Sequence, residues 1–290
     1  MKLSNEVPDV NYHLTNKCNM KCRFCFAQFK DVNELNKDES IKIVRKISDF
    51  GFKKINFVGG EPTLYPWLSD LILEAKNAGM TTSIVTNGSR INEEWLETNI
   101  EYLDWLGFSI DSLIPEINQK LGRCFYPLGA PGYEFYYNTL LNVKRYDVKI
   151  KINTVVTSKN KDERFHRLIS EIRPDKWKIF QVLILKGENS EAKDLAISRN
   201  EFEMFLVNHI DLQSKAEIFP EYNHDMIGSY IMIDPAGRFF DNTKGFYSLS
   251  ENILKVGVKK ALNQITIDPK KFSIRQDLTR INNIVTQLNQ

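Results

Sequence analysis

The sequence predicts an α/β fold, specifically a partial, TIM-like (β/α)6 barrel followed by a C-terminal extension that contains a β-hairpin. Short β-rich runs alternate with longer helical patterns up to about residue 212, which is typical of a parallel sheet. Six such units can be traced, whereas a complete barrel needs eight. We therefore assign residues 1–212 to the barrel and 213–290 to an extension that closes the site within the same compact unit.

Six runs rich in β-branched and aromatic residues are expected to form the strands, and five stretches between them have helical patterns. The strands are expected at 10–14, 54–58, 81–86, 105–110, 148–156 and 177–185. The helices are expected at about 35–50, 66–79, 93–99, 133–146 and 162–171. Glycines near the helix ends, as in "FGF" at 50–52 and "AGM" at 78–80, support these boundaries.

The last part of the chain no longer shows the regular alternation of strands and helices. "SYIMIDPAGRFFDN", residues 229–242, predicts a hairpin because β-branched and aromatic residues flank Pro235, Ala236 and Gly237. A final helix is expected at 253–262, and the polar end "INNIVTQLNQ" at 281–290 is either helical or frayed.

The charge balance excludes a global electrostatic attraction to nucleic acid or membranes. The chain has 39 Lys and Arg against 37 Asp and Glu, and it is 42% hydrophobic and 26% charged. No apolar run approaches the ~20 residues of a membrane span, and the first residues lack a secretory signal. Three of the four cysteines are clustered, which fits metal binding in a reducing compartment better than disulfides. We expect a cytoplasmic protein that binds neither nucleic acid nor membranes.

Polar motifs follow four consecutive strands: "TNKC", "GGEP", "TNGS" and "SIDS". In parallel α/β folds, ligands bind at the carboxyl ends of the strands. The agreement among four neighbouring loops therefore predicts a ligand site at this end of the sheet.

The cysteines Cys18, Cys22 and Cys25 have the spacing C-x3-C-x2-C. Thiolates bind zinc or iron–sulfur clusters, but structural zinc prefers four protein ligands. His13 lies within the first predicted strand, and Cys124 is distant and has no partner thiol nearby in sequence. A cluster held by three cysteines would leave one iron for an outside ligand; structural zinc and unliganded buried cysteines are the alternatives.

Two strands carry lysines on a single face. Because side chains alternate along a strand, Lys149, Lys151 and Asn153 share one face, and Lys176 and Lys178 share one face of the next strand. If the apolar faces pack on the outer helices, the lysines point into the barrel. Several unpaired ammonium groups there require an anionic partner, and a polyphosphate offers many acceptors. The alternatives are lysines in solvent on edge strands, or lumen carboxylates that pair with them.

The cysteine spacing, with Phe24 before the last cysteine and "VGGEP" after the second strand, resembles the radical S-adenosylmethionine (radical SAM) superfamily. The resemblance implies that the three cysteines hold a [4Fe–4S] cluster whose free iron binds SAM, the cosubstrate. It further implies that the backbone of Gly59, Gly60 and Glu61 faces the SAM amino group. The polar side chains of Asn87, Ser89 and Ser109 would hold the ribose and methionine moieties of SAM. Arg123 would pair with its carboxylate.

Within this superfamily, "NYHLTNKCN", "KWKIFQ" and "KGEN" resemble the viperin family of antiviral nucleotide dehydratases, and the similarity covers nearly the whole chain. The resemblance implies conversion of a nucleoside triphosphate (CTP, UTP or GTP) to its 3′-deoxy-3′,4′-didehydro form. An electron donor such as flavodoxin or ferredoxin is implied as a partner. Lys151, Asn153, Lys176 and Lys178 match positions that hold the triphosphate, and Tyr230 matches a tyrosine proposed to deliver a proton or hydrogen equivalent.

Three departures from the vertebrate pattern limit this transfer. The amphipathic N-terminal helix and the C-terminal tryptophan are missing, and the loop "GFYSLSEN" lacks basic residues. Two other functions stay open: a radical SAM enzyme that acts on a peptide or another phosphorylated metabolite, and a zinc-stabilised nucleotide-binding module.

Overall fold

A computed structural model describes residues 7–29, 32–279 and 281 of the chain. Within them, ten strands form one sheet in the order β10-β9-β8-β1-β2-β3-β4-β5-β6-β7. The strands are β1 (Asp9–His13), β2 (Lys54–Val58), β3 (Thr81–Thr86), β4 (Trp105–Ser109), β5 (Lys149–Val156), β6 (Lys176–Gln181), β7 (Glu217–Glu221), β8 (Ile231–Ile233), β9 (Arg238–Asp241) and β10 (Ser248–Asn252).

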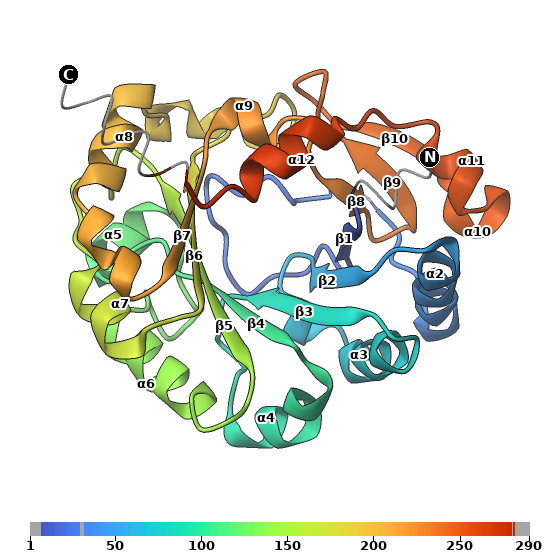
Figure 1. Cartoon of the computed structure of the whole chain (residues 1–290), viewed down its shortest axis with the longest axis horizontal. Coiled ribbons are helices and arrows are strands. Elements are labelled where there is room, and N and C mark those ends of the chain that lie inside the picture. The colour runs from blue at the N-terminus through green and yellow to red at the C-terminus, as the bar shows by residue number, and fades with distance from the viewer. Residues whose placement is uncertain (1–6, 30–31, 280, 282–290) are drawn as a thin grey trace.

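The sheet curls into an open barrel (Figure 1). Strands β1 to β7 run parallel in chain order, and β8 pairs in parallel with the other side of β1. Strand β7 ends the sheet order on one side without pairing with β8. Helix α12 (Pro269–Arg275) crosses this gap in Figure 1 and contacts β7. The predicted partial barrel is confirmed.

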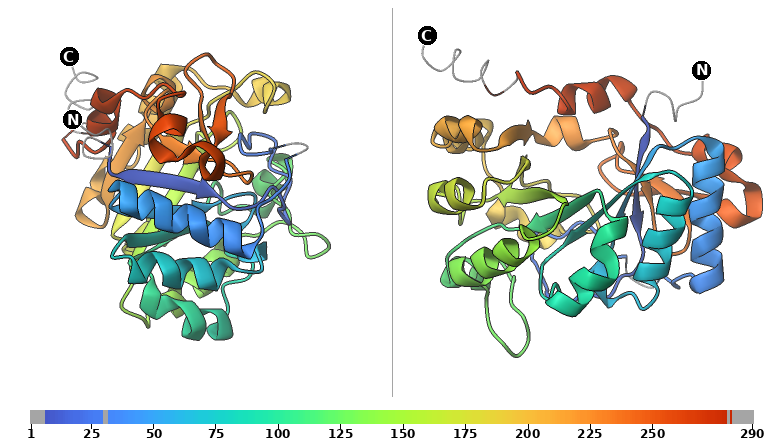
Figure 2. Two further views of the ribbon diagram at one scale, coloured as in Figure 1. Left: turned by 90° about the vertical axis from the view of Figure 1, so that its right-hand side faces the viewer. Right: turned by 60° about the horizontal axis from the view of Figure 1, so that its bottom comes forward.

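Helices cover the outer surface of the barrel (Figures 1 and 2). The longer ones are α2 (Lys37–Phe50), α3 (Leu68–Asn77), α4 (Glu93–Asn99), α5 (Pro115–Lys120), α6 (Tyr133–Val143), α7 (His166–Ile172) and α8 (Arg199–Val207). The short ones are α9 (Asn223–Met226), α10 (Ile253–Val256), α11 (Val258–Leu262), η1 (Pro62–Leu64), η2 (Ile100–Tyr102), η3 (Ser190–Leu195) and η4 (Ile210–Ser214). Apolar side chains between helices and sheet form the core.

Most predicted elements agree with the structure to within a few residues at each end, and the largest differences lie at one end of a strand and one end of a helix. The strand expected at 177–185 ends at Gln181, because Asn189 bonds the chain beyond it: its side chain accepts from the Leu185 amide (2.7 Å) and donates to the Leu183 carbonyl (2.9 Å). The helix expected from residue 162 begins only at His166, because the carboxylate of Glu163 instead accepts from a neighbouring loop.

The extension contains the predicted hairpin and also completes the sheet. Strands β8 and β9 are antiparallel and joined by a turn in which Gly237 has a φ of 73°. The predicted final helix is interrupted at Gly257, which has a φ of 82° and separates α10 from α11. Strand β7 was not predicted, because Pro220 lies inside it. Except for Ile281, the segment 281–290 lies outside the described residues.

None of the helices in the described part of the chain combines the length and the apolar character that crossing a bilayer would require.

Candidate active site

One cavity of ≈ 1040 Å³ lies inside the barrel and connects the two features that the sequence singled out, the cysteines and the lysines. Of the predicted site residues, only Ser89 is not part of its lining. The predicted residues that line it are Cys18, Cys22, Cys25, Gly59, Gly60, Glu61, Asn87, Ser109, Arg123, Lys151, Asn153, Lys176, Lys178 and Tyr230.

The cysteine loop follows β1 at the carboxyl end of the sheet. Burial raises the pKa of Cys22 to about 12 and that of Cys25 to about 11, and Arg123 opposes both shifts. No three His, Cys, Asp or Glu side chains among the described residues lie close enough to share a single metal ion. Zinc draws its thiolates to ~2.3 Å, whereas a four-iron cluster spreads its cysteines over different irons. Three thiolates are donors of the kind that hold iron–sulfur clusters, so the donor set fits a cluster.

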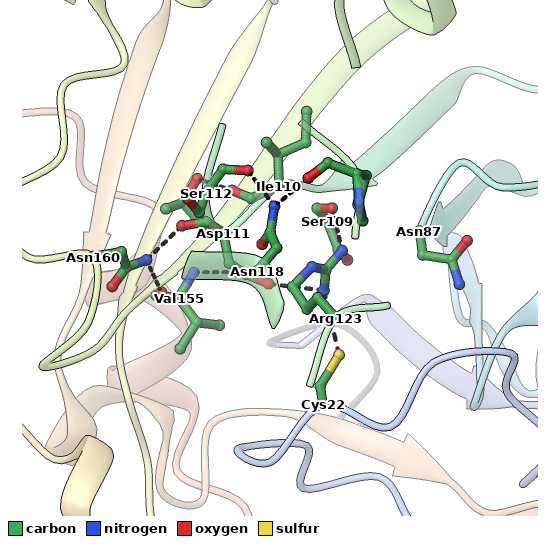
Figure 3. A network of polar contacts seen from close by, with 12 residues as sticks. Cys22, Asn87, Ser109, Ile110, Asp111, Ser112, Asn118, Arg123, Val155 and Asn160 are labelled. Atoms are coloured by element: carbon green, nitrogen blue, oxygen red, sulfur yellow. Dashed lines mark hydrogen bonds and ion pairs between the residues drawn. The ribbon is translucent and has the colours of Figure 1, made fainter. Parts of the chain in front are cut away.

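Arg123 is buried beside the cysteines and is held by three groups of the protein (Figure 3). It forms an ion pair with Asp111 (2.8 Å), donates to the Ser109 carbonyl (2.6 Å) and contacts Cys22 Sγ (3.7 Å). Burial alone would lower the pKa of Arg123, but Asp111, Tyr136 and Cys22 together outweigh it, so the pKa is raised. The guanidinium therefore stays charged next to a cysteine sulfur. Its pairing with the SAM carboxylate stays a prediction.

The "GGEP" loop packs directly on the cysteine loop. The amide of Gly60 donates to the Thr15 carbonyl (2.6 Å), and the amide of Glu61 donates to the Lys17 carbonyl (2.8 Å). A Cβ on Gly60 would lie 2.2 Å from the Lys17 oxygen, and one on Gly59 would lie 2.9 Å from the Thr15 oxygen. Glycine is thus required by the contact between two loops, in addition to any approach to a ligand.

Glu61 also joins the second loop to the third. Its buried carboxylate accepts from the Thr86 hydroxyl (2.6 Å) and from the Asn87 amide (2.7 Å). The side chain of Asn87 donates to Asn19 (2.8 Å), and Asn19 in turn donates to the Ser89 hydroxyl (2.9 Å). Ser89 thereby contributes to the wall behind the cavity. Asn19 lies inside the cysteine motif, but the sequence analysis assigned it no role.

Lys151, Lys176 and Lys178 face the cavity, as predicted from the alternation, and they lie toward the amino ends of their strands. Lys151 pairs in register with Lys176, and Asn153 pairs with Lys178. On the opposite face, Ile152 and other apolar side chains of these strands are fully buried. Gly107 is the register partner of Lys151, and a Cβ there would lie 2.8 Å from Lys151 Cε. The glycine therefore makes room for the lysine. Lys149, in contrast, is exposed and lies over Trp105 (5.3 Å).

The environments of the three lumen lysines differ. Burial lowers the pKa of Lys151 well below its usual value, and the ammonium groups of Lys54, Lys178 and Lys176 lower it further. The same causes lower the pKa of Lys176 to about 8. Among the described residues, no carboxylate lies within 4.0 Å of Lys151 or Lys176, whereas Lys178 pairs with Glu221 (2.5 Å). Of these three lysines, only Lys178 therefore pairs with a carboxylate in the lumen, which was one of the alternatives to a bound polyphosphate.

Tyr230 belongs to a buried charged network. Its hydroxyl donates to Glu221 (2.5 Å) and accepts from Lys178 (3.2 Å). The guanidinium of Arg275 lies over the Tyr230 ring (3.6 Å) and 3.5 Å from the Glu221 carboxylate. Burial would raise the pKa of Glu221, but the two cations and the Tyr230 hydrogen bond together outweigh it, so the pKa is lowered. The tyrosine is thus held between a carboxylate and two cations.

Five further residues shape the cavity or its walls, and the sequence analysis missed them. They are Lys54, Asp111, Asn189, Glu221 and Arg275. Lys54 opens a predicted strand, Asp111 lies in the "SIDS" motif and Asn189 lies in "KGEN", but none of these patterns indicated a role for the residue. The positions of Glu221 and Arg275 depend on contacts between distant segments.

Comparisons with known proteins agree with this geometry. The family model of the Radical SAM superfamily matches residues 12–172. A solved structure, native anSMEcpe with bound AdoMet, shares the fold with a TM-score of 0.67 and 17% identity, covering 92% of this chain and 82% of that one. The chain belongs to the radical SAM superfamily, whose members use a [4Fe–4S] cluster and SAM.

Curated relatives narrow the class further. An S-adenosylmethionine-dependent nucleotide dehydratase of Flammeovirga pacifica is 42% identical over 95% of this chain and 96% of its own length. The S-adenosylmethionine-dependent nucleotide dehydratase RSAD2 of Danio rerio is 37% identical over 92% of this chain and 76% of its own length. Within the superfamily, the chain belongs to the family of these dehydratases.

Proposed function

We propose that this chain is a radical SAM nucleotide dehydratase that converts a ribonucleoside triphosphate to its 3′-deoxy-3′,4′-didehydro form. The reaction removes the 4′ hydrogen and the 3′-hydroxyl. In balance, it consumes the nucleotide, SAM, two electrons and one proton, and it yields the didehydro nucleotide, water, methionine and 5′-deoxyadenosine. A product without a 3′-hydroxyl terminates chain extension by polymerases, which fits a role in antiviral defence.

The observation that carries this proposal is the shared cavity. Three cysteines line the end at which the strands terminate, and Lys151 and Lys176 line the end at which they begin. Neither lysine has a carboxylate partner among the described residues, so an anion is needed to stabilise the charged forms. A nucleoside triphosphate meets this need with its phosphates, and its ribose then extends along the barrel toward the cysteines.

Cys18, Cys22 and Cys25 are the proposed ligands of the cluster. When bound, the cluster and SAM supply the 5′-deoxyadenosyl radical, which abstracts hydrogen. Arg123 keeps a positive charge beside Cys22 Sγ (3.7 Å) and favours the thiolate form that binds metal. The protein residues contribute orientation and the exclusion of water.

Lys151, Asn153, Lys176 and Lys178 are proposed to hold the triphosphate through charge-assisted hydrogen bonds. Tyr230 is proposed to supply the proton late in the reaction. Its hydroxyl donates to Glu221 (2.5 Å), which orients it, and lies 3.2 Å from the Lys178 ammonium, which can return a proton to it. An electron donor such as flavodoxin or ferredoxin completes the proposed set of partners.

A direct test uses anaerobically reconstituted protein with SAM, dithionite and one of CTP, UTP, GTP or ATP. Mass spectrometry follows 5′-deoxyadenosine and the nucleotide product. We expect at least one nucleotide to raise 5′-deoxyadenosine well above the blank and to lose the mass of one water molecule. If none of the four does so, the nucleotide proposal is wrong, and a peptide or another phosphorylated metabolite becomes the candidate substrate.

Colour and metal content distinguish the proposed enzyme from the alternative function, a zinc-stabilised nucleotide-binding module. A reconstituted protein that absorbs broadly near ~400 nm and contains iron and sulfide supports the cluster. A colourless protein with stoichiometric zinc supports the module.

A further inference from the structure

A short loop at residues 125–129 projects from the barrel (Figure 2). Tyr126 is 93% exposed and Leu128 is 86% exposed. Phe125 and Gly129 exchange two backbone hydrogen bonds of 2.8 Å, so the loop is a closed turn rather than an open strand. The turn holds the two side chains in solvent, where they contribute nothing to the hydrophobic core.

The base of this loop is bonded to the cysteine loop. The Lys21 amide donates to the Gly122 carbonyl (3.2 Å), and the Arg23 amide donates to the Leu121 carbonyl (2.9 Å). These donors flank Cys22 in the sequence. The base of the projecting loop is therefore tied to the backbone that carries the proposed cluster ligands.

The two segments that meet here carry charge of one sign. Residues 16–26 and 119–130 contain no Asp or Glu, although acidic and basic residues are nearly balanced over the whole chain. Their basic residues are Lys17, Lys21, Arg23, Lys120 and Arg123. Arg123 is buried, whereas the other four are exposed. Lys17 pairs with Glu34 (3.5 Å) and Arg23 pairs with Asp194 (2.7 Å). In the described part of the chain, no carboxylate lies within 4.0 Å of the ammonium groups of Lys21 and Lys120.

Exposed aromatic and aliphatic anchors with a charged rim are typical of protein interfaces. The complementary partner has an acidic surface, because opposite charges speed the encounter of two proteins, whereas a basic partner would be repelled. Transient complexes of electron-transfer proteins have interfaces at the low end of the size range. Two exposed apolar side chains and a few lysines suit a partner of this kind.

We propose that Tyr126, Leu128, Lys21 and Lys120 form a docking surface for an acidic one-electron carrier protein. This inference rests on the proposed function, because that reaction requires electrons. The carrier loses one electron and the cluster gains one, and neither an atom nor a proton is transferred. The position of the loop brings the carrier to the cysteine end of the barrel and leaves the lysine end to the substrate.

The test measures binding and activity separately with a bacterial flavodoxin and a [2Fe–2S] ferredoxin. Isothermal titration calorimetry of the reconstituted protein gives the Kd for each oxidised carrier without turnover. We expect Lys120→Glu and the double variant Tyr126→Ser/Leu128→Ser to raise the Kd at least fivefold. The matched controls Lys46→Glu on α2 and Met204→Ser on α8 change an exposed lysine and an exposed apolar residue elsewhere, and they should leave it within twofold.

SAM cleavage distinguishes docking from general damage. With dithionite, which needs no docking surface, the loop variants should cleave SAM within twofold of the parent. With the reduced carrier, their KM for the carrier should rise in proportion to the Kd. The docking proposal would be overturned if the variants bind the carrier as the parent does, or if the parent binds neither carrier. It would also be overturned if the variants lose as much SAM cleavage with dithionite as with the carrier. A change of oligomeric state in the loop variants with unchanged carrier affinity would overturn it in favour of self-association. Failure of nucleotides to stimulate the dithionite reaction in the parent would instead count against the proposed function.

Discussion

The replacement Lys151→Met tests whether the buried ammonium group of Lys151 serves ligand binding rather than the stability of the fold. Lys151 is only 9% exposed, has no carboxylate within 4.0 Å among the described residues, and has a pKa lowered well below its usual value. Methionine keeps an unbranched side chain beside Gly107 but removes the ammonium. Burying an unpaired ammonium group costs free energy, and methionine removes this cost, so the unliganded variant should be at least as stable as the parent.

The same replacement should weaken nucleotide binding. A hydrogen bond to a charged group contributes roughly 1.5–3 kcal/mol, which corresponds to a loss of affinity of about 10- to 150-fold. Calorimetry without reductant measures the affinity, and thermal unfolding without nucleotide measures the stability, where each kcal/mol corresponds to about 2–4 °C. Lys149→Met on the same strand is the control, because Lys149 is exposed and outside the cavity.

The pH dependence of this stability difference has a definite sign. Because the folded state lowers the pKa of Lys151, the unfolded chain binds more protons between that pKa and the ordinary value near ~10.4, and the parent becomes more stable as pH rises through this window. The advantage of the variant should therefore shrink between pH 7 and 10. A destabilised variant that binds nucleotide within twofold of the parent would refute the reasoning.

Three further predictions concern the walls of the cavity and its charge. Glu221→Gln leaves two buried cations without their carboxylate and should lower the free energy of unfolding by about 3–5 kcal/mol, measured by denaturant titration; a loss below ~1 kcal/mol would contradict the network. Gly60→Ala places a Cβ 2.2 Å from the Lys17 carbonyl oxygen and should lower iron and sulfide content after reconstitution, whereas full content would show that the loops can separate. Because the pKa of Lys176 is lowered to about 8, triphosphate affinity should fall as pH rises from 7 to 9.5, and Lys176→Arg should flatten this fall; equal slopes would assign the pH effect to another group.

Much of the architecture could be predicted because its signals are local. Strand and helix periodicity defined the barrel units, and the two-residue alternation placed Lys151 and Lys178 on the inner face. The resemblance implies that Gly59 and Gly60 face the SAM amino group. Their close contact with the backbone of residues 15–17 became visible only in the folded chain.

The contacts that were missed join segments far apart in sequence. Glu221 lies in a strand that contains Pro220, and Arg275 reaches it only because α12 lies across the gap in the sheet. Asn189 bonds the Phe24 carbonyl of the cysteine loop (2.8 Å) after the sixth strand has ended. None of these pairs has a periodic signature, so no sequence pattern predicts them.

The most direct test of the proposed reaction follows the hydrogen that leaves the substrate. The reconstituted protein is supplied with SAM, dithionite and a nucleoside triphosphate that carries deuterium at C4′, and mass spectrometry measures the 5′-deoxyadenosine formed. Transfer of the 4′ hydrogen predicts 5′-deoxyadenosine heavier by one mass unit, together with a dehydrated nucleotide. Unlabelled 5′-deoxyadenosine, formed in amounts that the nucleotide still stimulates, would contradict abstraction at C4′.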